Sequence, residues 1–296
     1  MKKTGSAMTF ICLMGVVSLF ADMVQEGARS IFGSYLSFMG ASAAMIGIIT
    51  GAGELAGYSL RALTGCIAVK TGQYWLMTIV GYSLAVLAIP CLALVPDGSW
   101  VGAAFFIILG RMGKAIRQPA KSTLLSYAGS QEGVGKSFAI QEFLDQTGAF
   151  LGPVMLLLVF RHVGTEAPSA LYHEGFALLL LPALCCIAAV VLAKIKFPHP
   201  EDFEVEAKKA APFRMEKSFF LYMLGIGLFA FGFMDFPLIT LHASRTGLVA
   251  ESTLPLLYAV AMGVDAFAAL AFGVLLTATA FHRWPFLRWW HCPLRQ

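Results

Sequence analysis

The sequence predicts an all-α membrane protein built as a bundle of long apolar helices. Of its 296 residues, 58% are hydrophobic and only 13% are charged, and the mean hydropathy is +0.75. A soluble domain carries about 25% charged residues, so this chain lacks the polar side chains to cover a water-facing surface. The strands of an outer-membrane barrel would alternate in polarity, whereas here the apolar residues follow one another in long runs.

Eight stretches of the sequence are long enough to cross a bilayer as helices, which takes about 20 mostly apolar residues. The first stretch is long, and we expect it to tilt or bend near Gly27. Short links at 39–42 and 96–99 indicate that the helices they join lie antiparallel. The predicted spans are 8–36, 43–66, 74–96, 100–118, 136–160, 174–195, 218–240 and 253–278.

Lysine and arginine are distributed unequally between alternate loops. Lys70 and Lys121 follow the second and fourth spans, and six further bases lie between residues 194 and 217. The loops of the other side hold only Arg161 and Arg245. Because cytoplasmic loops carry the excess of bases, we expect a multi-pass protein of the cell inner membrane with its N-terminus in the cytoplasm.

The polar, proline-containing segment 196–217 divides the predicted spans into six and two. We expect an N-terminal six-helix transmembrane bundle over 1–195, a cytoplasmic linker over 196–217, and a partial C-terminal bundle of two helices over 218–278. Residues 279–296 form an atypical tail rich in tryptophan and arginine.

A short internal repeat supports this division. The tripeptide Leu19–Phe20–Ala21 recurs at 228–230, and seven residues after each leucine stands an acid, Glu26 or Asp235. Span one then corresponds to span seven, as in a protein made of two parallel six-helix halves. Two such halves need twelve spans, so eight spans indicate a C-terminally truncated chain. A genuine short protein with an interfacial Trp/Arg anchor is the alternative.

Charged side chains interrupt the apolar spans, although each costs about 2.5–3.5 kcal/mol at the centre of a membrane. In the first five spans acids and bases are equal in number, which favours pairing around a shared interior over a pore of one charge. Such an interior predicts substrate binding or proton transfer, and fixed salt bridges that hold the bundle are the alternative. The candidate substrate- and proton-coupling residues are Asp22, Glu26, Arg29, Glu54, Tyr58, Arg61, Arg111, Lys114, Glu142 and Asp145.

Steps of three and four residues place most of these side chains on shared helical faces. One face of the fourth span carries a cationic stripe, which suits an anionic substrate or acids on other helices. The shared faces comprise Asp22, Glu26 and Arg29 on the first span, Glu54, Tyr58 and Arg61 on the second, and Arg111, Lys114 and Arg117 on the fourth, with Lys121 continuing this last face just beyond the span.

Glycines mark two places for close packing or movement. In the fifth span a Gly-x-x-x-Gly pair lets helices approach closely, and the proline after it bends the helix. After the second span, a tight turn with a base at the cytoplasmic face suits a gating hinge. Ordinary helix packing and an ordinary basic loop are the alternatives. The residues are Gly148, Gly152 and Pro153 in the span, and Gly65, Lys70 and Gly72 in the turn.

Taken together, these motifs resemble the major facilitator superfamily (MFS) over roughly residues 8–273. The turn is similar to the family's loop between helices two and three, with Val69 in place of the family's aspartate. Arg111 matches the arginine of the helix-four motif, which the family links to proton coupling. The glycines and proline of the fifth span match its antiporter motif. The resemblance implies an MFS-like helical bundle with a complete six-helix N-terminal half and about two helices of the second half.

The resemblance implies a secondary active transporter that moves a small solute across the lipid bilayer by alternating access, coupled to a proton or another ion. Glu26 and Glu54 are the first candidates to carry the proton and Asp22 is the next, with Asp235 and Asp265 as counterparts in the second half. No enzyme activity, cofactor, metal or nucleic-acid partner is implied. The alternatives are a non-transporting membrane protein with structural salt bridges and a non-functional truncated fragment.

Overall fold

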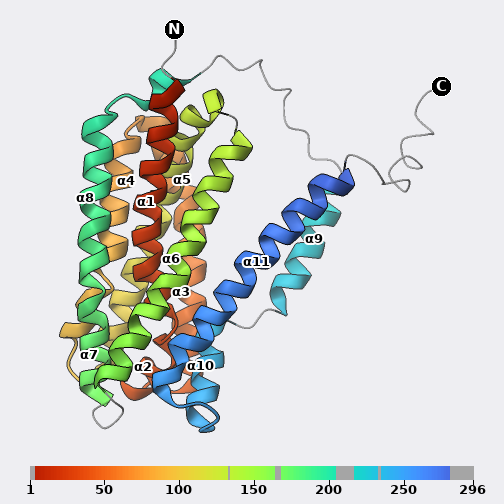
Figure 1. Cartoon of the computed structure of the whole chain (residues 1–296). Coiled ribbons are helices and arrows are strands. Elements are labelled where there is room, and N and C mark those ends of the chain that lie inside the picture. The colour runs from red at the N-terminus through yellow and green to blue at the C-terminus, as the bar shows by residue number, and fades with distance from the viewer. Residues whose placement is uncertain (1–3, 133, 164–167, 205–216, 233–234, 281–296) are drawn as a thin grey trace.

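The computed structural model describes residues 4–132, 134–163, 168–204, 217–232 and 235–280, and their regular structure is entirely helical (Figure 1). The predicted six-helix N-terminal half is confirmed. Its elements are α1 (Thr4–Arg29), α2 (Phe32–Phe38), α3 (Ala43–Thr71), α4 (Tyr74–Leu87) with the 3₁₀ turn η1 (Pro90–Leu94), α5 (Trp100–Glu132), α6 (Val134–Val163), α7 (Pro168–Leu178) and α8 (Leu180–Lys196).

Within the residues that the structure describes, six stretches of helix are long and apolar enough to cross a membrane. The chain is therefore a multi-pass integral membrane protein. Helix α5, which carries the predicted cationic stripe, is long enough to span but is not one of the six. The stretches are Ser6–Arg29, Ala43–Thr71, Tyr74–Leu94, Ser137–His162, Ser169–Lys196 and Phe219–Arg245.

The first and fourth predicted spans are among those whose bounds differ in the structure. The first is interrupted, because α1 ends at Arg29 and α2 starts again at Phe32, where a Cβ on Gly33 would lie 1.9 Å from the carbonyl oxygen of Pro237. The fourth, predicted to end at residue 118, continues through Pro119 to Glu132. Its last turns are polar, and a polar helix leaves no apolar signal in the sequence.

Helix α1 packs against α6, α8 and α5. Its contact with α6 is close because two glycines face it. A Cβ on Gly148 would lie 2.2 Å from the carbonyl oxygen of Leu19, and one on Gly152 would lie 2.2 Å from that of Met23. Helices that approach this closely gain van der Waals contact along their whole length.

The 3₁₀ turn η2 (Pro200–Phe203) lies within the predicted linker. Beyond the linker, the chain forms α9 (Lys217–Phe231), α10 (Phe236–Arg245) and α11 (Leu254–Ala280), and the 3₁₀ turn η3 (Glu251–Thr253) precedes α11. The predicted seventh span is thus divided between α9 and α10. Helix α10 packs against α2 and α3, and α11 packs against α6. In Figure 1, α9 and α11 lean away from the six-helix bundle. Residues 205–216 of the predicted linker and 281–296 of the predicted tail lie outside the described residues.

Candidate functional site

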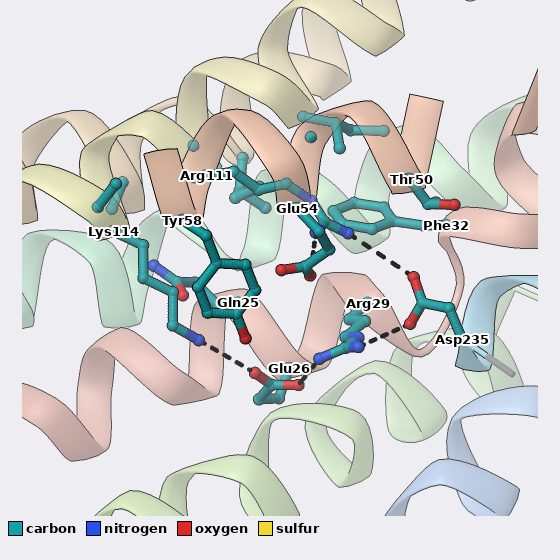
Figure 2. A pocket seen from close by; sticks show the side chains of 18 of the residues that line it. Gln25, Glu26, Arg29, Phe32, Thr50, Glu54, Tyr58, Arg111, Lys114 and Asp235 are labelled. Atoms are coloured by element: carbon teal, nitrogen blue, oxygen red, sulfur yellow. Dashed lines mark hydrogen bonds and ion pairs between the residues drawn. The ribbon is translucent and has the colours of Figure 1, made fainter. Parts of the chain in front are cut away.

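A cavity of about 620 Å³ lies between α1, α3 and α5, and Asp235 and Leu238 also line it (Figure 2). Phe32, Ile89, Ile107 and Leu238 give it apolar walls. Its polar lining comprises Gln25, Glu26, Arg29, Thr50, Glu54, Tyr58, Arg61, Arg111, Lys114 and Asp235.

Glycines of α3 create the space for this cavity. Gly51 and Gly57 line it, and a Cβ at either position would meet no atom within 4 Å. At Gly53, by contrast, a Cβ would lie 2.7 Å from Cδ of Arg111. The missing side chains therefore leave room for a bound molecule and for the arginine that reaches across from α5.

Acids and bases alternate around the cavity, beginning on α1. The ammonium group of Lys114 lies 3.7 Å from Oε1 of Glu26, and Nη1 of Arg29 lies 3.8 Å from Oε2 of the same carboxylate. The hydroxyl of Tyr258, on α11, donates a hydrogen bond of 2.5 Å to that Oε2. Glu26 therefore joins three helices through one carboxylate.

The alternation continues through Asp235, the residue that precedes α10. Its Oδ1 accepts a hydrogen bond of 2.6 Å from Nη2 of Arg29, and its Oδ2 lies 3.9 Å from Nη2 of Arg111. Arg111 in turn donates a short hydrogen bond to Glu54 on α3. We call this set the ionic circuit. Its members in order are Lys114, Glu26, Arg29, Asp235, Arg111 and Glu54, and Figure 2 shows their side chains pointing toward one another.

A second group of charged residues lies deeper between α1, α4, α5 and α6, outside the cavity. Nη2 of Arg117 lies 3.7 Å from Oδ1 of Asp22, and its guanidinium stacks 4.3 Å from the centre of the Tyr82 ring. The ammonium of Lys121 lies 3.6 Å from Oδ2 of Asp145. Each base of the α5 stripe therefore faces an acid from another helix, as burial of charge in a low-dielectric interior requires.

The structure brings seven of the ten candidate coupling residues to the cavity and places three elsewhere. Asp22 and Asp145 belong to the deeper group. Glu142 faces away, where it accepts a hydrogen bond of 3.1 Å from Gln146. Gln146 also donates to Asp265 at 3.3 Å, so that acid does not join the ionic circuit.

The candidate gating and packing residues lie away from the cavity lining. Gly72 ends α3 in the left-handed conformation, with φ of +66°, which a side chain disfavours. Lys70 is exposed in the last turn of α3, and a Cβ added at Gly65 would lie 3.6 Å from Cβ of Pro119, an ordinary contact distance. Pro153 lies inside α6, directly after the glycine that meets α1.

Several residues of the site carry no signal in the sequence. Gln25 lines the cavity and Tyr258 bonds to Glu26, but both are uncharged side chains in apolar surroundings. The position of Tyr82 beneath Arg117 likewise depends on how α4 packs against α5. Across the described part of the chain, no cluster of His, Cys, Asp or Glu is arranged to hold a metal ion.

Solved structures share this fold. A bacterial homologue of the human drug peptide transporters PepT1 and PepT2 superposes with a TM-score of 0.54 at 13% sequence identity, over 93% of this chain and 58% of the transporter. The MFS-like helical bundle expected from the motifs is thereby confirmed. No family model matches the chain.

Relatives are also found by sequence. The uncharacterized protein Rv2265 of Mycobacterium tuberculosis is 38% identical over 274 residues, which are 90% of this chain and 65% of the relative. The chain therefore spans about two thirds of the length of that protein. The uncharacterized MFS-type transporter MJ1317 of Methanocaldococcus jannaschii is 29% identical over 153 residues, covering 52% of this chain and 38% of the relative.

Proposed function

We propose that the protein acts as a secondary transporter of the major facilitator type, which moves a small solute through the cavity and couples that movement to a proton gradient. The observation that carries this proposal is the ionic circuit. It lines a cavity large enough for a small solute, and it joins the six-helix bundle to the first helices of the second half. The MFS fold and the MFS-type relative support the same function.

The ionic circuit suits alternating access because it links ligand binding to contact between the halves. Asp235 approaches the bundle through Arg29 and Arg111, so a charged solute that displaces either arginine also weakens this contact. A charge left unpaired in a low-dielectric site is costly. Each ion pair of the circuit is therefore kept unless a charged ligand replaces one of its members. Solute binding, which takes an arginine away from Asp235, and movement of the halves, which needs that contact to break, are then coupled.

Glu26 is the residue best placed to carry the proton. Its side chain is 14% exposed, and it has partners on α1, α5 and α11. A proton on this carboxylate removes the charge that attracts Lys114 and Arg29, and it makes the group a weaker acceptor for the Tyr258 hydroxyl. Glu54, at 45% exposure, has one charged partner, and its protonation would change less of the circuit.

Purified protein in liposomes with an inward proton gradient tests this function. We expect accumulation of one or more members of a labelled panel of dialanine, benzoate, glucose and choline, which covers zwitterionic, anionic, neutral and cationic solutes. Glu26→Gln should abolish gradient-driven accumulation and retain exchange of internal for external solute, because the cavity is intact and only the proton site is lost. Glu174→Gln, an exposed acid on α7, is the control.

Two outcomes would contradict the proposal. Accumulation that persists in both Glu26→Gln and Glu54→Gln would remove these carboxylates from the coupling step. A protein that is folded, reconstituted and inert toward all four solutes would oppose transport itself and favour a structural role for the ion pairs.

A further inference from the structure

We propose that the cavity selects a small organic anion and that Arg61 is the side chain that pairs with its carboxylate. This inference rests on the proposed transport function, since it names the class of solute that the same cavity would carry. Four bases line the cavity, whereas three carboxylates do so. The excess of one base gives the cavity a net positive charge, which favours an anionic solute.

Three of the four bases are already paired within the ionic circuit. Lys114 faces Glu26, Arg29 faces Glu26 and Asp235, and Arg111 faces Glu54 and Asp235. Arg61 is different, because none of the ion pairs found in the described ranges includes its guanidinium. Its Nε is buried and has no hydrogen-bond acceptor there, as is also true of Nε of Arg29, whose other nitrogens are already in ion pairs. An arginine at a cavity wall with a donor unsatisfied is a site prepared for an acceptor from outside the chain.

Packing holds this guanidinium at the cavity wall. Its Cζ lies 5.0 Å from the centre of the Tyr58 ring, one turn earlier on α3, within the range of a cation–π contact. Both residues line the cavity, and Figure 2 shows the Tyr58 ring reaching into it. The contact limits the conformations of a long side chain, so less freedom is lost when a ligand binds.

The chemistry of guanidinium favours a carboxylate over other groups. Its planar array of donors matches the two oxygens of a carboxylate, and the resulting bidentate pair is among the stronger hydrogen-bonded contacts in proteins. A neutral solute leaves the charge uncompensated, and a cationic solute adds to it. The remainder of the solute contacts the apolar walls formed by Phe32, Ile107 and Leu238.

Binding of three probes of nearly equal size, benzoate, benzamide and benzylammonium, to the detergent-purified full chain tests the inference by calorimetry. We expect benzoate to bind about tenfold more tightly than benzamide, the ratio that one net charged hydrogen bond supplies, and benzylammonium to bind most weakly. In Arg61→Gln, benzoate affinity should fall to that of benzamide, whereas Arg61→Lys should keep part of the preference. Arg161→Gln, which removes an exposed base of α6 outside the cavity, should bind like the parent protein.

Equal affinity for benzoate and benzamide, no benzoate binding, or a preference that survives in Arg61→Gln would overturn the inference. Thermal unfolding of each variant separates lost binding from lost folding. The liposome experiment separates this inference from the transport proposal. A benzoate preference that depends on Arg61, without solute flux, supports the anion site and opposes transport. Flux of other panel solutes by a protein with no benzoate preference opposes the anion site alone.

Discussion

Glu26 and Asp235, the two acids related by the internal repeat, both contact Arg29. Oε2 of Glu26 lies 3.8 Å from Nη1 of the arginine, and Oδ1 of Asp235 lies 2.6 Å from its Nη2. Asp235 occupies the N-cap position of α10 but makes no capping hydrogen bond with its own helix. Its carboxylate instead spans to α1, so contact between the halves takes precedence over a local helix cap.

A double-mutant cycle should detect this contact. Arg29→Gln and Asp235→Asn should each lower the free energy of unfolding. The loss in the double variant should be about 1 kcal/mol smaller than the sum of the two single losses. The coupling is modest because the side chains remain 34% and 22% exposed. Chemical denaturation in detergent gives the four free energies. The pair Arg29→Gln with Glu174→Gln is the control, and additivity in both cycles would contradict the contact.

The Gly-x-x-x-Gly spacing predicts a close helix contact for α6, the structure shows that α1 is the partner, and the strength of this contact can be measured. Gly152→Ala should destabilise the protein by about 1–3 kcal/mol, because the new methyl group would overlap the carbonyl of Met23 and force the helices apart. Gly225→Ala is the matched control, since a Cβ there meets no atom within 4 Å, and it should be neutral or slightly stabilising. A tolerated Gly152→Ala, seen as an unchanged unfolding midpoint, would contradict this packing.

The loop before α5 provides a pH-dependent contact. Hydrogen bonds from Ser169, at 2.7 Å, and from His173 lower the pKa of the exposed Asp97. Because the folded-state pKa lies below the unfolded-state value of about 4, the contact stabilises the fold above that value. This stabilisation is lost as the pH falls through the lower, folded-state pKa. Ser169→Ala should weaken it, so thermal unfolding curves of parent and variant should differ at pH 7 and converge near pH 2. A difference that is constant with pH would contradict the linkage.

Sequence patterns identified the charged side chains of the site more readily than their partners. Arg111 and Glu54 are conspicuous in apolar spans, and helical spacing places Arg61 and Tyr58 on one face. The partners of these side chains cannot be read from the sequence, because Tyr258 and Glu26 are 232 positions apart and meet only through the packing of α11. The bend expected near Gly27 corresponds to the interruption between Arg29 and Phe32, whereas the approach of Pro237 to Gly33 could not be read from the sequence.

The pair of Glu54 and Arg111 distinguishes a fixed salt bridge from a moving one. Glu54→Arg alone should prevent folding or function, because it places two like charges together across the cavity. The exchanged variant, Glu54→Arg with Arg111→Glu, should recover folding in part. Recovery is incomplete because the new carboxylate at 111 would face Asp235, to which the native arginine is attracted at 3.9 Å. If the pair opens during transport, the exchanged variant should stay inactive in liposomes although it is folded, since the order of charges in the ionic circuit is broken. Full recovery of flux would instead show that the pair only holds α3 against α5.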